Sequence, residues 1–96
     1  MPQISLGLVE VRGYVALVEA IDAMLKAADV KIIHYEKVGG GLVSVCISGD
    51  IGAVRVAIEA GQAVASRISE AKSALIANPD RELFPLLNTN PGQSTL

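Results

Sequence analysis

The spacing of hydrophobic residues changes along the chain and divides it into six segments. The first is rich in β-prone residues without clean alternation, which is typical of a strand covered on both faces. Two segments place apolar residues three or four apart, as amphipathic helices do, and Asp50 stands at the N-cap position of the second. The other segments are strand-like. The six are expected over residues 4–11, 14–28, 31–37, 42–48, 51–67 and 71–77.

The order βαββαβ predicts an α+β fold of the ferredoxin-like kind, a four-stranded antiparallel sheet with two main helices on one face. A weak internal repeat supports it, because VEAIDA at 18–23 and IEAGQA at 58–63 occupy similar positions in the two predicted helices. We expect a single domain over residues 4–87, with one helical turn in RELFPLL, followed by a disordered polar tail over 88–96.

Strand and helix periods also predict which side chains share a face. In segment 31–37, strict alternation separates Lys31, Ile33, Tyr35 and Lys37 from Ile32, His34 and Glu36. The next strand is expected to turn Val43, Val45 and Ile47 to one side and Ser44, Cys46 and Ser48 to the other. The second helix is expected to bury Val54, Ile58, Gly61 and Val64 and to expose Arg55, Glu59, Gln62 and Ser66.

Composition excludes several classes of partner. The uncharged run between Lys37 and Asp50 is shorter than the roughly 18–20 residues that span a membrane, and the first residues do not form a signal peptide, so we expect a cytoplasmic protein. A single cysteine suits a reducing compartment. Eight Lys and Arg are dispersed among ten Asp and Glu, and aromatics make up 3%, which argues against nucleic-acid binding.

Few residues suggest catalysis. One histidine, His34, and one cysteine, Cys46, cannot make a His/Cys metal site, and no cofactor is expected. A Cys46–His34 dyad is conceivable on paired strands, although a strand cysteine is more commonly a small packing residue. Glu10 is either a buried general base or a partner for a basic group such as Arg12.

Three consecutive glycines join the third and fourth segments in VGGGL. A phosphate-binding loop opens a helix, whereas these glycines open a strand. A hairpin turn explains one or two of them through positive φ angles and leaves a third without a local reason.

Four blocks of the sequence are distinctive: GLVEVRG, EAIDAMLKAADV, YEKVGGGLV and GDIGAVRVAIEAG. Through these blocks, residues Ser5 to Arg67 closely resemble the hexameric shell proteins of bacterial microcompartments. That resemblance implies a flat ring of six subunits that tiles edge to edge around encapsulated enzymes. It also implies that the glycine loop meets its symmetry copies on the six-fold axis, so that the pore is lined by Lys37, Val38, Gly39, Gly40 and Gly41.

The same resemblance assigns residues to the edge of the ring. Lys26 matches the family's edge lysine, and Asp29 stands where the family often has asparagine. The family's last strand leads into a segment with an arginine that inserts into the neighbouring ring. In this chain Asn78 takes the place of that arginine, and Arg81 is a candidate substitute from a shifted position.

The sequence therefore predicts a structural shell protein without a catalytic step. Its expected partners are five further copies of itself, other shell proteins of the same compartment, and encapsulated enzymes or their targeting peptides. A small ligand-binding regulatory domain with a glycine-rich binding loop is the alternative.

Overall fold

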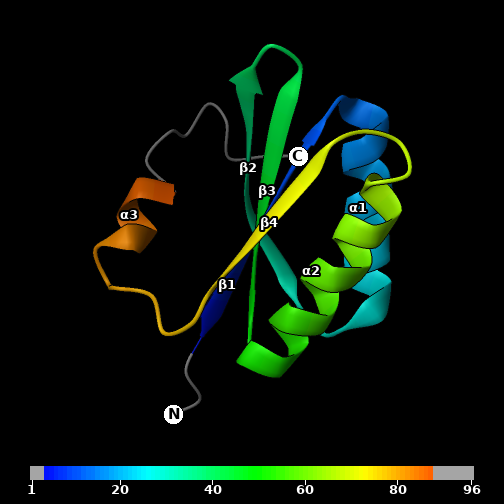
Figure 1. Cartoon of the computed structure of the whole chain (residues 1–96). Helices are drawn as coiled ribbons and strands as arrows, with labels where there is room; N and C mark the ends of the chain where they lie inside the picture. Colours follow the sequence, from blue (N-terminus) through cyan, green and yellow to red (C-terminus); the bar gives the residue numbers. More distant parts are fainter. Residues whose placement is uncertain (1–3, 88–96) are drawn as a thin grey trace.

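A computed structural model describes residues 4–87, which fold into the six predicted elements and a short helix within RELFPLL, where one helical turn was expected (Figure 1). The elements are β1 (Ser5–Arg12), α1 (Tyr14–Ala27), β2 (Lys31–Gly39), β3 (Leu42–Gly49), α2 (Ile51–Ala65), β4 (Ala71–Ile76) and α3 (Leu83–Leu87). The predicted element order is confirmed.

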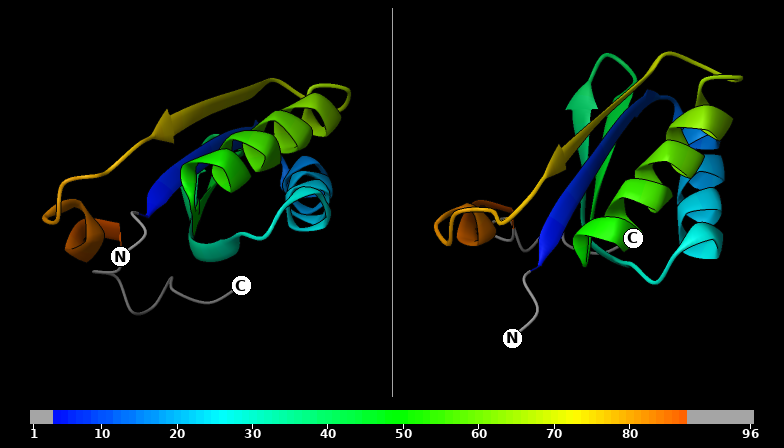
Figure 2. Two further views of the ribbon diagram at one scale, coloured as in Figure 1. Left: turned by 90° about the horizontal axis from the view of Figure 1, so that it is seen from below. Right: turned by 60° about the horizontal axis from the view of Figure 1, so that its bottom comes forward.

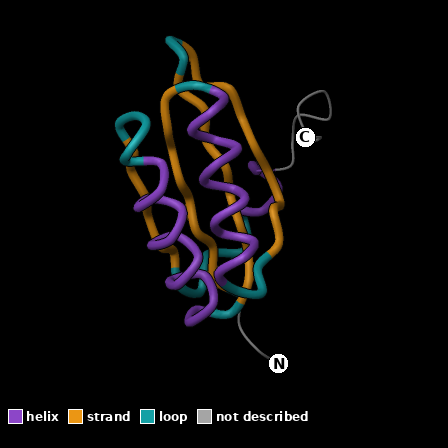
Figure 3. Tube along the Cα trace, turned by 90° about the vertical axis from the view of Figure 1, so that its right-hand side faces the viewer, coloured by secondary structure: helices purple, strands orange, loops and turns teal. Residues whose placement is uncertain are grey.

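The four strands form one antiparallel sheet in the order β2-β3-β1-β4. Helices α1 and α2 run in opposite directions, side by side, over one face of this sheet (Figure 3). The short α3 lies on the other side (Figure 2). This arrangement confirms the predicted α+β sandwich.

Glycine at two positions lets neighbouring elements approach closely. A Cβ on Gly7 would lie 2.6 Å from Cγ2 of Ile58 and 2.7 Å from Cγ1 of Val54, so β1 and α2 touch across this residue. A Cβ on Gly61 would lie 2.6 Å from Cγ of Met24, which is fully buried. The first contact joins the sheet to α2, and the second joins α2 to α1.

The two main helices begin differently. The Asp50 carboxylate accepts a hydrogen bond of 2.9 Å from the N–H of Ala53, which satisfies one free donor of the first turn of α2 and confirms the predicted N-cap. The N-cap position of α1 is Gly13, whose φ is 91° and which makes no side-chain cap. The start of α1 therefore depends on backbone contacts with its neighbours.

The predicted alternation of segment 31–37 is wrong at Ile32. The pairing of β2 with β3 shifts between Ile32 and His34, as at a β-bulge, so that Ile32 lies opposite Ile47 and Tyr35 opposite Val45. Both Ile32 and Tyr35 pack against the core under the helices. An extra residue resets the alternation of a strand, and a hydrophobic pattern alone does not locate it.

The expected outward face of α2 is wrong at Gln62. Its Nε2 donates a 3.1 Å hydrogen bond to the carbonyl of Ala71, and its Oε1 accepts one from the hydroxyl of Ser73. Val64, predicted to point inward, is only half-buried, and its neighbour Ala65 is fully buried instead. Gln62 thus ties α2 to β4.

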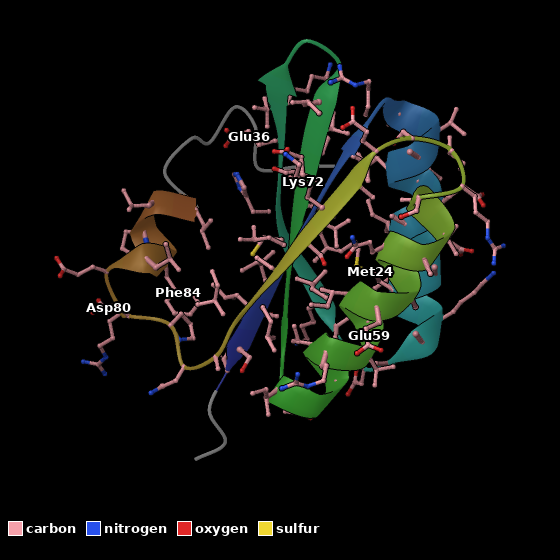
Figure 4. All side chains as sticks on the ribbon, in the orientation of Figure 1. Met24, Glu36, Glu59, Lys72, Asp80 and Phe84 are labelled. Atoms are coloured by element: carbon pink, nitrogen blue, oxygen red, sulfur yellow. The ribbon has the colours of Figure 1, made fainter. Side chains whose placement is uncertain are left out.

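The sheet face turned away from α1 and α2 also contains buried residues. Leu6 and Cys46 are almost fully buried there, and His34 is 8% exposed. Figure 4 places Phe84 of α3 on the opposite side of the sheet from Met24. Both faces therefore contribute to burial, although the larger core lies under the helices.

Candidate functional site

The glycine loop adopts a backbone conformation that favours glycine at all three positions. Gly39, Gly40 and Gly41 have φ angles of 120°, 62° and 86°, in the region that side chains disfavour. The expectation that a hairpin turn accounts for only one or two of them is therefore wrong. The turn alone explains the third glycine.

The space in front of the loop is open. A Cβ on Gly39 or Gly40 would meet no atom within 4 Å. The hairpin tip projects past the other connections at its end of the molecule (Figures 1 and 3). Val38 is 52% exposed and Lys37 is exposed, so all five predicted loop residues face outward from the subunit.

Residues at the end of β1 fasten this loop. Nη1 of Arg12 donates a hydrogen bond of 2.5 Å to the carbonyl of Gly40, and the N–H of Gly13 donates one of 2.7 Å to the carbonyl of Gly41. The sequence interpretation considered Arg12 only as a partner for Glu10, and no ion pair joins these two in the described chain. Neither segment alone carries a sequence signal for this contact, because its two residues lie 28 positions apart.

Two surface grooves lie near the loop and on the open sheet face. One, of about 420 Å³, is lined by Gly13, Tyr14, Tyr35, Lys37, Gly39, Gly41, Leu42 and Val43. The other, of about 330 Å³, is lined by Leu8, Val9, Glu10, Ser44, Lys72, Ser73 and Ala74. Within residues 4–87, no group of three or more His, Cys, Asp or Glu side chains is placed to hold a metal ion.

His34 and Cys46 lie directly opposite each other on β2 and β3 but hydrogen-bond elsewhere. Nε2 of His34 lies 3.2 Å from Oε1 of Glu36, and the Cys46 thiol lies 3.9 Å from the carbonyl of Ile47. Burial raises the pKa of the Cys46 thiol to about 11. A thiol of this kind is a poor nucleophile at neutral pH, which favours the packing role.

The four predicted edge residues are exposed but lie in two separate places. Lys26 forms an ion pair of 2.9 Å with Asp22 in α1, and this carboxylate raises the pKa of Lys26 through its hydrogen bond and its charge. Asp29 lies beyond the end of α1, which stops at Ala27. Its side chain is therefore not related to Lys26 by helical spacing.

The other two edge residues follow β4, on the side of the sheet opposite α1 (Figure 2). Asn78 has a φ of 50°, the single positive value at a non-glycine residue in the described chain. Asparagine tolerates this conformation better than most residues, so Asn78 serves the turn that leads toward α3. The Asp80 carboxylate then accepts a 2.9 Å hydrogen bond from the N–H of Glu82.

Among residues 4–87, no helix has both the length and the apolar character needed to cross a membrane.

This fold and these sequence blocks define a known class. Residues 5–79 match the BMC domain, the domain of bacterial microcompartment proteins, and the chain belongs to this family. The chain is 44% identical over 88 residues to the bacterial microcompartment shell protein PduA of Citrobacter freundii, across 91% of this chain and 95% of that protein. It is 43% identical over 96 residues to the carboxysome shell protein CsoS1C of Hydrogenovibrio crunogenus, across 95% and 94% of the two chains.

A solved structure agrees. The crystal structure of a microcompartment protein from Desulfitobacterium hafniense matches 98% of this chain with a TM-score of 0.79 and 31% identity. The chain spans 50% of the length of that protein. The resemblance to shell proteins and the fold class are thereby confirmed.

Proposed function

We propose that this chain is a structural subunit of a microcompartment shell, that it assembles into rings of six, and that its glycine loop lines a central pore for small polar metabolites. The observation that carries the proposal is the similarity to two shell proteins over nine-tenths of the chain. No catalytic step is assigned to the subunit. Its domain is residues 4–87, and the predicted tail over 88–96 lies outside the described residues.

Exposed apolar side chains support assembly with further copies. In helix α1, the exposed fraction is 68% for Tyr14, 66% for Val15 and 48% for Leu25, and in α2 it is 50% for Val56. Large apolar residues exposed on two neighbouring helices favour a surface that another protein covers. A cyclic ring needs two different faces on every subunit, and these helices offer one.

The geometry of the loop supports a pore. Its five residues Lys37 to Gly41 project at one end of the subunit into open space. Six copies converging on an axis leave little room for side chains, and glycine keeps such a site open. The loop backbone there offers N–H groups that can hydrogen-bond polar solutes.

The edge of the ring is assigned to Lys26 and Asp29 on one side of the subunit and to Asn78 and Arg81 on the other. All four are exposed and available to a neighbouring ring. Other shell proteins, and encapsulated enzymes or their targeting peptides, are the remaining partners that we propose.

Native mass spectrometry tests the ring directly. We expect a particle of six chains at micromolar concentration, and flat sheets or tubes by electron microscopy at higher concentration. A trimer, or a monomer that changes state with a small ligand, would instead favour a regulatory ligand-binding domain and would contradict the shell proposal.

A further inference from the structure

The glycine loop is tied to the body of the subunit by a single charged side chain. Arg12 ends β1, and its Nη1 donates the 2.5 Å hydrogen bond to the carbonyl of Gly40. A hydrogen bond from a guanidinium is stronger than one between neutral groups. The carbonyl it holds belongs to Gly40, whose Cβ position, like that of Gly39, has no atom within 4 Å.

The base of this side chain is itself fixed. Arg12 pairs with Leu42 across β1 and β3, and its N–H donates a 3.1 Å hydrogen bond to the hydroxyl of Ser69. Its Cγ and Nη1 both lie 3.7 Å from the Cβ position of Gly41, so the side chain runs along the loop in van der Waals contact. Arg12 thus connects β1, the loop and the turn between α2 and β4.

This contact sets the direction of one peptide group. The described chain contains no cis peptide bond, and in a trans peptide the carbonyl and the N–H point in opposite directions. Because the Gly40 carbonyl is directed at Arg12, the N–H of Gly41 is directed away from it. Three glycines in succession would otherwise let this peptide rotate with little steric resistance.

We infer that Arg12 is the positioning residue of the glycine loop, the side chain that decides which way the Gly40–Gly41 peptide faces. The inference rests on the proposed role of the loop in a pore, because there it determines whether the lining presents donors or acceptors. Arg12 acts through the backbone and contacts no solute itself.

The N–H of Gly13 reports how firmly Arg12 holds the loop, since it donates to the carbonyl of Gly41 and loses this partner whenever the loop swings out. The full chain is labelled with ¹⁵N-glycine, which gives nine signals, and amide hydrogen exchange is measured. Gly61, buried within α2, reports unfolding of the whole subunit. In Arg12→Met we expect Gly13 to exchange about threefold to tenfold faster, with Gly61 unchanged.

Two further variants complete the test. Arg12→Lys retains a charged donor and should restore part of the protection, whereas Arg55→Met, which removes another exposed arginine, should leave both signals unchanged. An unchanged Gly13 in Arg12→Met, or an equal rise at Gly13 and Gly61, overturns the inference. Native mass spectrometry of the same samples distinguishes the two proposals. A missing hexamer overturns the proposed ring, whereas the exchange rate of Gly13 relative to Gly61 alone decides the role of Arg12.

Discussion

The glycines of the core and the glycines of the hairpin loop are required for opposite physical reasons. At Gly7 and Gly61 a Cβ would lie 2.6 Å from a neighbouring side chain, so space is the constraint. At Gly39 and Gly40 a Cβ would meet nothing within 4 Å, and the positive φ angle is the constraint. The preference for glycine in the loop therefore does not come from crowding within the subunit.

The distinction bears on the proposed pore. Within one subunit, the loop needs glycine for its turn, and no crowding is present. Crowding arises only if symmetry copies approach the same axis. Substitutions that separate the cost of the backbone from the cost of crowding therefore test the loop, and matched substitutions in the core provide the contrast.

The largest effect is expected at Gly61. Gly61→Ala places a methyl group against Cγ of Met24 and should lower the free energy of unfolding by about 1–3 kcal/mol, measured by urea denaturation. Gly52→Ala, in the first turn of the same helix, is the matched control. Its Cβ would lie 3.4 Å from Oδ1 of Asp50, and we expect a gain of up to about 1 kcal/mol from the better helix propensity of alanine.

A double substitution sharpens this result. Met24→Ala removes Cγ, so the added cost of Gly61→Ala should fall by at least about 0.5 kcal/mol in the Met24→Ala background. Strictly additive losses would show that the two residues do not compete for the same space.

A smaller loss of stability is expected at Gly40, where the cost comes from the backbone. With a φ of 62°, Gly40→Leu should lower the free energy of unfolding by about 1–2 kcal/mol, and Gly40→Asn by less because asparagine tolerates this region. Both variants should still form hexamers by native mass spectrometry. In a ring, the leucine appears six times around one axis, and a crystal structure of Gly40→Leu with an unobstructed axis would refute the pore.

The sequence was sufficient to predict the order of the helices and strands and the N-cap of α2, because these depend on local spacing and on one capping side chain. It was insufficient at Ile32, where a bulge reset the strand, and at Gln62, whose amide found partners in β4. Both failures come from contacts between segments, strand pairing of β2 with β3 in one case and side-chain hydrogen bonds from α2 to β4 in the other, and the pattern within a single segment does not reveal them. Burial of His34 likewise depends on which segments cover the second face of the sheet.

The candidate site divides in the same way. The run of glycines marked the loop and the family resemblance added Lys37 and Val38 to it, but the reason for the third glycine required the φ angles. The contact from Arg12 to Gly40 joins residues 28 positions apart and has no signature in either segment alone. The role of Asn78 as a turn residue is likewise visible only from its backbone angle.

Cys46 provides a milder test, on the face of the sheet away from the helices. Cys46→Ala should cost about 1 kcal/mol for lost packing and leave the hexamer intact. The folded state raises the thiol pKa from 9.0 to about 11, so the unfolded chain loses this proton first as pH rises. The contribution of the thiol to stability is therefore complete below pH 9 and is lost as pH approaches 11.

Wild type and Cys46→Ala should accordingly differ in how steeply their urea midpoints fall between pH 9 and 11, with the wild type steeper. Identical pH profiles would show that Cys46 is not held as a buried neutral thiol. A measurable turnover abolished by alkylation of Cys46 would contradict the shell proposal itself.

The smallest effect on subunit stability is expected at Lys26. Its substitution should instead affect the contact between neighbouring rings. Lys26 is exposed and already paired with Asp22 at 2.9 Å, so Lys26→Ala should leave stability and hexamer mass unchanged. A two-fold contact repeats at all six edges of a ring, so a small loss at each edge should suppress sheets and tubes in electron micrographs. High salt should weaken wild-type tiling in the same direction.

The partner of Lys26 across the edge is the remaining question, and we predict that it is Asp29 of the facing subunit. Asp29 lies beyond α1 and makes no ion pair within the described chain, whereas Asp22 competes for Lys26 inside the subunit. Asp22→Ala should therefore preserve or strengthen tiling, and Asp29→Ala should weaken it. Exchanging the charges, with Lys26→Asp and Asp29→Lys together, should restore part of what either single change removes. If Lys26→Ala tiles as readily as wild type at equal concentration, other residues hold the edge. The turn at Asn78 would then have changed the contact between rings by more than the loss of one arginine side chain.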